Sequence, residues 1–251
     1  MIYITKKYTY FHEFGDNLLK FNKLELEFIF IFYILIFIYR CIKIYKMNKN
    51  KISIIIPCKD ERLSLNKVLG ELKKIQFIDE IIVVLDSTKD RSLKIVKKNK
   101  CKYIIQKNKG YGSAIVEGFK KAKNSYGCIF NADHSFIPKY LDEMHSLSKK
   151  NDFIFGTRYK GNSGSDDDSL LTFIGNKIFS FICRNFLNIR LTDVLYTYVL
   201  CNTKKFNSIK FKSSDFRLCI ELPHNVSKKK FKYTEIPMFE RKRFAGTKKV
   251  N

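Results

Sequence analysis

The stretch CIFNADHSFIP at residues 128–138 places Asn131, Asp133 and Ser135 at every second position. Alternate side chains of an extended segment point the same way, so these three oxygens can face one ligand. Oxygen is the donor that Mg²⁺ and Mn²⁺ prefer, and such a cation binds a diphosphate. The competing interpretation is structural, because Asn-x-Asp before a proline also forms turns and helix caps. The pattern therefore predicts either a divalent-cation site or a turn.

The elements around this stretch indicate an α/β fold. Residues 128–130 are typical of the end of a buried strand, and Pro138 predicts the first turn of a helix. Strand patterns at 52–56, 81–85, 103–105 and 153–156 alternate with helical patterns at 65–72 and 114–122, and Pro57 is expected to end the first strand. This alternation predicts one domain with a mostly parallel sheet. The polar cluster then lies at the carboxyl edge, where open α/β sheets bind ligands.

Composition and charge narrow the class of protein. The 251 residues are 45% hydrophobic, enough for one sizeable core. A net charge of +24 implies an anionic partner, whether nucleic acid, an acidic membrane surface or a phosphorylated substrate. Seven cysteines without a Cys-x-x-Cys pair argue against a disulfide framework and a zinc site, and favour a reducing compartment.

Two apolar segments bear on membrane association. Residues 28–39 form an unbroken apolar run, shorter than the roughly 20 residues of a spanning helix. We therefore divide the chain into an extension, 1–46, that is an interfacial anchor or is dispensable, and a domain, 47–251. After a loop at 160–168 that we expect to be mobile, residues 170–187 predict a helix. Its apolar face is expected to pack in the core, with a membrane-facing helix as the alternative; that face comprises Leu171, Ile174, Ile178, Phe181, Ile182 and Phe186.

With these pieces placed, the chain resembles the family 2 glycosyltransferases, within them the branch that moves mannose or glucose onto polyprenyl (dolichyl) phosphate. The resemblance rests on eight segments in order from residue 52 onward: IIIPCKDE at 54–61, DSTKD at 86–90, NKGYGSA at 108–114, NAD at 131–133, GTRY at 156–159, TD at 192–193, EIP at 235–237, and Arg243 with Gly246. There are three departures from the pattern. Asn131 replaces the first Asp of the metal motif, Leu85 replaces the first Asp of a pair, and Thr197 and Val199 replace a Gly and an Arg.

The resemblance implies a GT-A fold and inverting transfer of a hexose from a nucleotide-diphosphate sugar to polyprenyl phosphate, with Mg²⁺ or Mn²⁺ as cofactor. It places the protein at the cytoplasmic face of a membrane, peripheral or N-terminally anchored. It assigns the metal to Asn131, Asp133 and Ser135, and catalysis to Asp133 and Arg158. The acceptor phosphate is assigned to Arg158, Arg243 and Lys249. The nucleotide sugar is assigned to Pro57, Asp60, Glu61, Asp86, Gly110, Gly112, Asn131, Ala132 and Asp133.

Several alternatives stay open. Asp86 and Asp90 could cap a helix, Glu61 could complement a helix dipole, and the three acceptor cations could be solvated surface groups. His134 is expected to be a loop residue. The acceptor could instead be a hydroxyl of a glycan, lipid or protein, and the reaction could be nucleotidyl transfer. A nucleic-acid-binding protein ranks below these because the sequence lacks zinc-finger, basic-zipper and RNP patterns.

Overall fold

The computed structural model describes residues 28–40 and 51–245, and the chain divides into two units, Met1–Lys49 and Asn50–Asn251. In the first unit, residues 28–40 form a helix, and most of its large apolar side chains are exposed. Within the described residues, no helix is both long enough and apolar enough to cross a membrane. The interfacial role of this helix stays a prediction.

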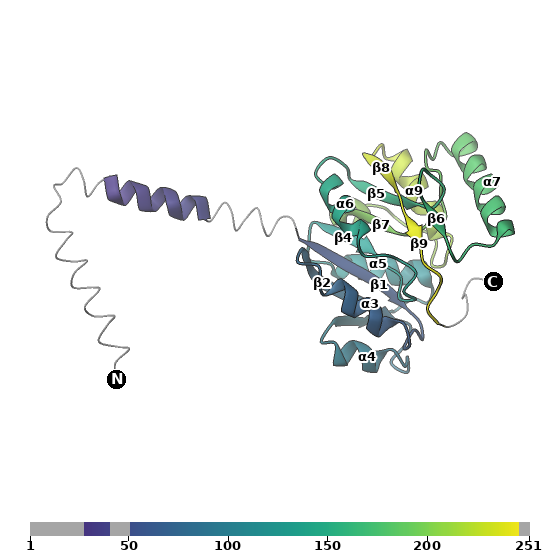
Figure 1. Ribbon diagram of the computed structural model, residues 1–251, viewed down its shortest axis with the longest axis horizontal. Coiled ribbons are helices and arrows are strands. Elements are labelled where there is room, and N and C mark those ends of the chain that lie inside the picture. The colour runs from purple at the N-terminus through teal and green to yellow at the C-terminus, as the bar shows by residue number, and fades with distance from the viewer. Residues whose placement is uncertain (1–27, 41–50, 246–251) are drawn as a thin grey trace. The chain divides into compact units, whose positions relative to one another are not determined.

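The second unit is built on a central sheet with helices packed around it (Figure 1). The sheet has seven strands in the order β3-β2-β1-β4-β7-β5-β8. Strands β3, β2, β1 and β4 are parallel, as are β5 and β8, whereas β7 is antiparallel to both of its neighbours. The predicted mostly parallel sheet is confirmed. Its strands are β1 (Ile52–Cys58), β2 (Ile78–Leu85), β3 (Lys102–Ile105), β4 (Tyr126–Ile129), β5 (Phe153–Thr157), β7 (Val199–Asn202) and β8 (Tyr233–Pro237).

Pro57 does not end β1, contrary to the prediction, because the strand continues to Cys58 and Pro57 pairs with Val84. The N–H of Phe130 bonds to Ile55 O, so Ile55 faces β4, and Pro57, two residues on, faces the same side. The pairing with β4 has already ended at Ile55. The missing N–H of proline therefore costs the sheet no hydrogen bond there.

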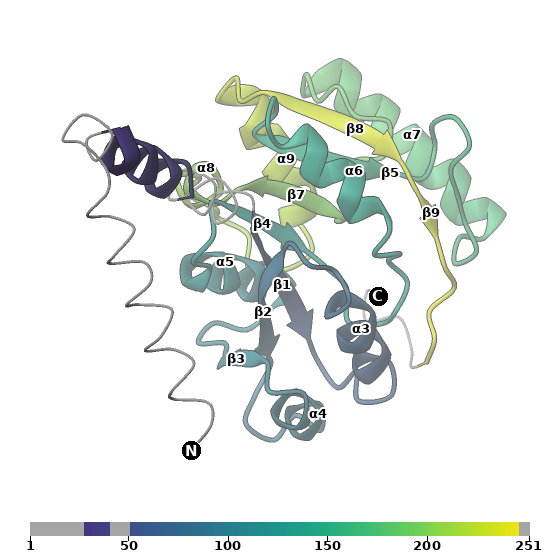
Figure 2. The ribbon, with the colours of Figure 1, turned by 60° about the vertical axis from the view of Figure 1, so that its left-hand side comes forward.

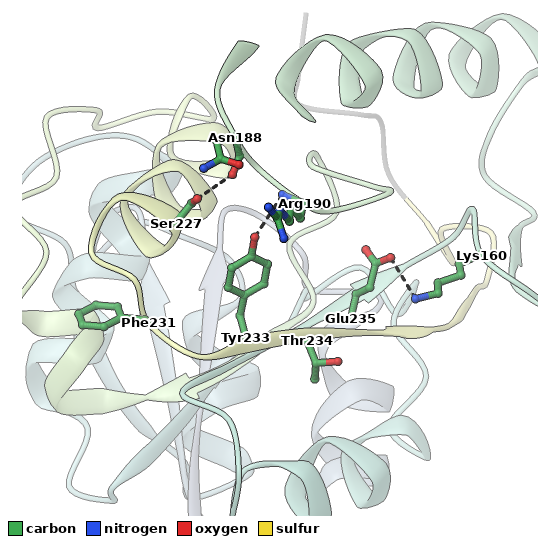
Figure 3. Close-up of a pocket in the computed structure, with 8 residues that line it drawn as sticks. All are labelled: Lys160, Asn188, Arg190, Ser227, Phe231, Tyr233, Thr234 and Glu235. Atoms are coloured by element: carbon green, nitrogen blue, oxygen red, sulfur yellow. Dashed lines mark hydrogen bonds and ion pairs between the residues drawn. The ribbon is translucent and has the colours of Figure 1, made fainter. Parts of the chain in front are cut away.

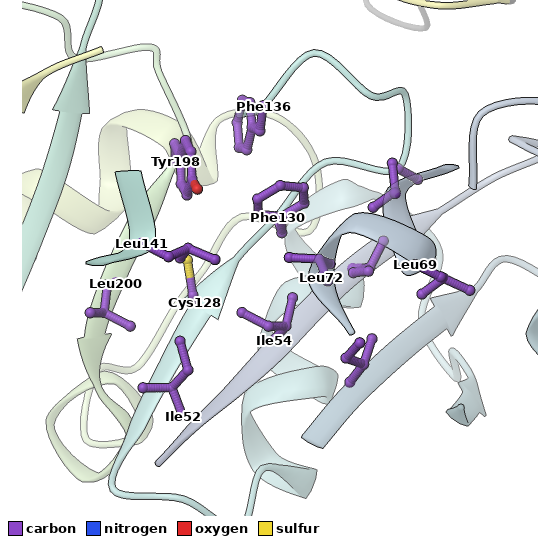
Figure 4. Packing of buried hydrophobic residues seen from close by; sticks show 14 of the residues in the cluster. Ile52, Ile54, Leu69, Leu72, Cys128, Phe130, Phe136, Leu141, Tyr198 and Leu200 are labelled. Atoms are coloured by element: carbon purple, nitrogen blue, oxygen red, sulfur yellow. The ribbon is translucent and has the colours of Figure 1, made fainter. Parts of the chain in front are cut away.

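Helices cover both faces of the sheet (Figure 2). On one face lie α3 (Leu65–Leu72), α4 (Leu93–Lys98) and α6 (Tyr140–Leu147), and on the other α5 (Tyr111–Lys121), α8 (Thr203–Asn207) and α9 (Leu218–Lys228). Alternate residues of β1 enter the two cores: Ile54 packs with Leu69, Leu72 and Phe130 (Figure 4), whereas Ile55 joins the opposite cluster. Pro138 precedes α6 instead of lying in its first turn, since Lys139 is the N-cap.

The segment before α7 is more ordered than predicted. Residues 160–168 contain β6 (Gly164–Ser165), which pairs with β9 (Phe239–Glu240) in a second, two-stranded sheet. The helix α7 (Leu170–Phe186) follows its N-cap Ser169, whose hydroxyl accepts a hydrogen bond from Thr172 N.

The core-packing prediction for α7 is wrong. Only Ser180 and Cys183 of this helix are buried, and the apolar side chains expected in the core are exposed, with Leu171 at 81%. Apolar residues occupy most of its circumference, so hydrophobicity alone could not decide which side packs.

The structure describes six of the seven cysteines. Six thiols in the described part of the chain are free: Cys58, Cys101, Cys128, Cys183, Cys201 and Cys219.

Candidate active site

Three acidic side chains follow neighbouring parallel strands at their carboxyl ends. Glu61 follows β1, Asp86 follows β2 and Asp133 follows β4. The chain leaves β1 toward β2 on one side, while β4 lies on the other side of β1, so the strand order reverses between β1 and β4. Open α/β sheets bind ligands at such a switch point. The structure thus brings Glu61 and Asp133 to the position expected of a ligand site.

Arg243 joins the two carboxylates across this switch point. Its Nη1 lies 3.1 Å from Glu61 Oε1, and its Nη2 lies 2.9 Å from Asp133 Oδ2. The backbone around it is held too, because Arg241 N donates to Ser135 O and Phe244 N donates to Asp133 O. We call residues 241–245 the closing segment. It places Arg243 beside the predicted donor carboxylates.

The 131–135 loop is ordered by its own side chains. Asp133 is 7% exposed, and its Oδ1 accepts hydrogen bonds from Ser135 N at 3.0 Å and from Ser135 Oγ at 2.7 Å. His134 lies in this loop, as predicted, with a positive φ of 70°. Its Nε2 lies 2.9 Å from Glu71 Oε1. Asp133 therefore presents its second oxygen, Oδ2, toward the switch point.

Two residues near Asn131 were not predicted to belong to the site. The Tyr111 hydroxyl donates to Asn131 Oδ1 at 3.3 Å and lies 2.8 Å from Thr197 Oγ1. Burial raises the pKa of the Tyr111 hydroxyl well above its usual range, so it stays a neutral donor. Tyr111 stood inside the glycine-bearing segment, and Thr197 had been noted only as a departure from the family pattern. Together they fix the orientation of the Asn131 amide.

The donor set at 131–135 consists of one carboxylate, one amide and one hydroxyl. No cluster of three or more His, Cys, Asp or Glu side chains able to hold a metal occurs within residues 28–40 and 51–245. Mg²⁺, however, is often held by one or two carboxylates and completes its shell with water and substrate phosphates. Arg243 Nε is buried without a hydrogen-bond acceptor among the described residues, and a phosphate oxygen could accept from it. These residues fit a cation-bound diphosphate.

Asp86 and Asp60 differ in what surrounds them. Asp86 accepts from Gln106 Nε2 at 3.3 Å and forms an ion pair with Lys109 at 3.3 Å, while a quarter of its side chain remains exposed. Asp60 is held by Arg91, whose Nε donates to Oδ1 at 2.7 Å. Both carboxylates lie at the carboxyl edge of the sheet, where they can also accept from sugar hydroxyls.

Asp90 has a structural role, but it is not the helix cap that one of the alternatives had proposed, because Ser92 is the N-cap of α4. Its carboxylate accepts from Ser92 N at 2.8 Å, just before α4, and from Asp60 N at 2.9 Å. Asp90 thus fixes the backbone of the Asp60 turn.

The two glycines predicted to contact the nucleotide lie against another backbone segment. Gly110 has a φ of 118°, and a Cβ there would lie 2.2 Å from Ser214 O. A Cβ on Gly112 would lie 2.7 Å from Asp215 O, and Ser113 N donates to Ser214 O. Close backbone approach therefore accounts for both glycines. Contact between them and a nucleotide stays a prediction.

Arg158 is enclosed by carboxylates. Its Nε lies 2.7 Å from Asp193 Oδ2, its Nη1 lies 3.0 Å from Glu240 Oε2 and 3.4 Å from Asp168 Oδ1, and its Nη2 lies 3.1 Å from Asp193 Oδ1. Burial alone would lower the pKa of Arg158, but Asp193 and Glu240 hold it above its usual range. Burial raises the pKa of the Glu240 carboxyl. All three guanidinium nitrogens are engaged, so Arg158 is not free to hold a phosphate in this structure.

The remaining predicted residues are accounted for as follows. Pro57 and Ala132 lie beside Glu61 and Asp133 on the same sheet edge, whereas Lys249 lies outside the described residues. A pocket of about 540 Å³ lies elsewhere, against β8 and α9, and its lining contains none of the predicted site residues (Figure 3). This pocket is lined by Lys160, Asn188, Arg190, Ser227, Phe231, Tyr233, Thr234 and Glu235.

The sheet order, with carboxylates at its switch point, defines a fold class, GT-A. A solved structure of this class, glucosyl-3-phosphoglycerate synthase from Mycobacterium tuberculosis with Mn²⁺, UDP and glucosyl-3-phosphoglycerate, superposes with a TM-score of 0.64. It is 9% identical, and the match covers 81% of this chain and 76% of that one. The same enzyme with Mg²⁺ and UDP gives a TM-score of 0.61 at 11% identity, with 82% and 76% covered. These similarities show the fold.

Residues 53–210 match the model of glycosyl transferase family 2, and the chain belongs to that family. Among its relatives, dolichol-phosphate mannosyltransferase from Pyrococcus furiosus is 29% identical over 117 residues, which are 43% of this chain and 33% of that protein. Dolichol-phosphate mannosyltransferase from Saccharomyces cerevisiae is 27% identical over 127 residues, 46% of this chain and 48% of that protein. The matches thus span half or less of these two relatives.

Proposed function

We propose that this protein transfers a hexose, with inversion, from a nucleotide-diphosphate sugar to a polyprenyl phosphate. Binding of the nucleotide-sugar donor is supported by one observation: Arg243 contacts both Glu61 and Asp133 where the strand order reverses. The acceptor half is supported by the relatives, which are named as dolichol-phosphate mannosyltransferases.

Residues around the switch point have distinct roles in this proposal. A Mg²⁺ or Mn²⁺ ion, held by Asp133 with help from Asn131 and Ser135, would supply positive charge to the leaving diphosphate. Arg243 binds the same diphosphate through its unpaired Nε. Asp86 and Asp60 accept hydrogen bonds from the base or ribose of the nucleotide, and Tyr111 holds Asn131 in place.

The proposed acceptor does not require a general base from the protein. A phosphate monoester with a second pKa near ~6 is largely a dianion at neutral pH and needs no proton removed before it attacks the sugar. It needs positive charge nearby. Within the Arg158 cluster, that charge becomes available only if Asp168, the longest contact at 3.4 Å, or Glu240 gives way.

This enclosure of Arg158 favours a second candidate function. One guanidinium surrounded by three carboxylates carries net negative charge, which repels a phosphate dianion more than a neutral hydroxyl. The second candidate is therefore a family 2 transferase with a hydroxyl acceptor on a lipid, glycan or protein.

The test is product identification with the acceptor varied. The full chain is incubated with GDP- and UDP-sugars, Mg²⁺ or Mn²⁺, and either polyprenyl phosphate or the matching polyprenol, and products are identified by mass. The proposal expects a polyprenyl-phosphate hexose, with transfer falling as pH drops through the second ionisation of the phosphate. Equal use of the polyprenol would select the hydroxyl-acceptor function, and transfer of the nucleotide with the sugar would reject both.

A further inference from the structure

Helix α7 turns two polar side chains, Asn176 and Ser180, toward the protein. Asn176 Nδ2 donates to the Tyr159 hydroxyl at 2.8 Å, and Ser180 Oγ accepts from Val194 N at 3.1 Å. Ser180 and Cys183 are its buried residues. An ordinary surface helix does the reverse and packs its apolar stripe against the core. The packed side of α7 thus combines these hydrogen bonds with Cys183 and Phe179, whereas most of its large apolar side chains are exposed.

The outward side of α7 carries a row of exposed apolar side chains, which we call the apolar stripe. Its members recur at helical spacing and so share one face: Leu170, Leu171, Ile174, Ile178, Phe181 and Ile182. Phe181 is 59% exposed, and Phe186 just beyond the stripe is 79% exposed. Contiguous exposed apolar patches on soluble proteins mark contacts with partners or membranes. The stripe thus indicates a docking surface.

The basic residues beside the apolar stripe indicate which kind of partner it binds. Lys177 and Arg184 lie seven residues apart on one flank of the stripe, and Arg190 follows the helix. All three are exposed, and none is ion-paired to a carboxylate within the described part of the chain. Asp166, Asp167 and Asp168 precede the helix, so positive charge is concentrated toward its middle and C-terminal end. An apolar face with a basic flank, on a chain of net charge +24, matches an anionic bilayer.

We propose that α7 lies in the plane of an anionic membrane, with the apolar stripe in the headgroup–acyl boundary and Lys177, Arg184 and Arg190 at lipid phosphates. With 17 residues, α7 is about 25 Å long and suits an interfacial position. Asn176 ties it to Tyr159, next to the carboxyl end of β5. The identity of the lipid acceptor rests on the proposed function. Binding through α7 would deepen that function, because it would hold the carboxyl edge of the sheet close to the bilayer.

A fluorescence experiment can test this helix apart from the rest of the chain. The protein has no tryptophan, so Phe181→Trp introduces a single indole into the stripe. With vesicles of phosphatidylglycerol and phosphatidylcholine, we expect its emission to shift to shorter wavelength and to be quenched by brominated acyl chains. Tyr103→Trp, on the edge strand β3 at the opposite end of the sheet, is the matched control and should show neither change. Co-flotation of the Phe181→Trp variant without a shift in its indole emission would overturn the proposal and assign binding elsewhere.

Charge substitutions give the second measurement. Ile178→Glu with Phe181→Glu should lower the vesicle partition coefficient of the full chain by at least roughly tenfold, since each buried side chain of this size is worth more than one decade. Tyr103→Glu should leave it unchanged, and circular dichroism should show all variants folded. Unchanged partition of the double variant would also overturn the proposal. A blue shift that depends on protein concentration without lipid would instead identify a second copy as the occupant. None of these readouts needs donor or acceptor, so failed sugar transfer would leave the result intact.

Discussion

Arg243 Nη2 lies 2.9 Å from Asp133 Oδ2, the carboxylate oxygen that Ser135 leaves open. A guanidinium thus occupies the position at which a divalent cation would meet this side chain. Two positive groups cannot share one oxygen without repulsion, so cation binding must move Arg243 or be weakened by it.

Replacing Arg243 with Gln should therefore change the affinity for the cation and the affinity for the nucleotide sugar in opposite directions. We expect Mn²⁺ alone, measured by electron paramagnetic resonance, to bind several-fold tighter, because Asp133 loses its competitor. Binding of the nucleotide sugar with Mn²⁺ should weaken by roughly ten- to a hundredfold, since charge-assisted hydrogen bonds are worth roughly 1.5–3 kcal/mol. Arg62→Gln, on the exposed residue after Glu61, is the control. Weaker Mn²⁺ binding in Arg243→Gln would contradict this interpretation.

Changes within the 131–135 loop should act in opposite directions. Asp133→Ala should abolish sugar transfer, whereas Asn131→Asp should keep transfer and lower the Mn²⁺ concentration needed for half-maximal rate, because a second carboxylate attracts the ion. Activity titrated against Mn²⁺ measures both effects. Transfer by Asp133→Ala in the presence of a chelator would show that the metal assignment is wrong.

Removing the Arg158 guanidinium should destabilise the fold. Arg158→Met leaves Asp193, which is 1% exposed, without its partner, and loss of one member of a buried charge group typically costs about 3–5 kcal/mol. Urea unfolding should show this loss, while exposed Arg184→Met should stay within about 0.5 kcal/mol of the native protein. If both variants unfold at the same urea concentration, the cluster does not stabilise the fold.

Acid sensitivity should depend on Glu80 in β2. Burial alone would raise the pKa of its carboxyl, but hydrogen bonds from Lys102, Lys123 N and Ser53 outweigh burial and hold the pKa below 4.5. The unfolded chain then binds more protons, so this stabilisation is complete above pH 4.5 and is lost as pH falls through the folded pKa. Glu80→Gln should flatten the pH dependence of the unfolding free energy below pH 4.5. Glu143→Gln, exposed on α6, is the matched control, and equal slopes would refute the assignment.

A chain that begins at Met47 should fold on its own. Its sheet and both hydrophobic clusters lie after residue 50. Circular dichroism and urea unfolding should match those of the full chain, and flotation with anionic vesicles should weaken without disappearing, because the α7 stripe remains. Insoluble protein would show instead that the extension is structural.

Sequence alone predicted the parallel half of the sheet well. The β-branched run at 52–56 and the polar residues at 131–135 are local signals. The run forms most of the central strand β1, and the polar residues follow β4 at the carboxyl edge of the sheet, as expected. The Arg158 cluster could not be predicted, because its carboxylates come from positions 10, 35 and 82 residues away. The orientation of α7 was missed for a related reason: periodicity shows that a helix has an apolar face but not what that face contacts.

The closing segment also has a consequence for biosynthesis. Arg243 lies 182 residues after Glu61. The edge of β4 that does not pair with β1 pairs with β7, which begins at Val199. On the ribosome, strands β1 to β4 can pair as soon as they emerge, since domains fold from the N-terminal side during synthesis. The nascent chain would then expose Glu61 and Asp133 without their guanidinium partner until residues 241–245 arrive. Translation of residues 241–245, rather than formation of the sheet, would complete the donor site.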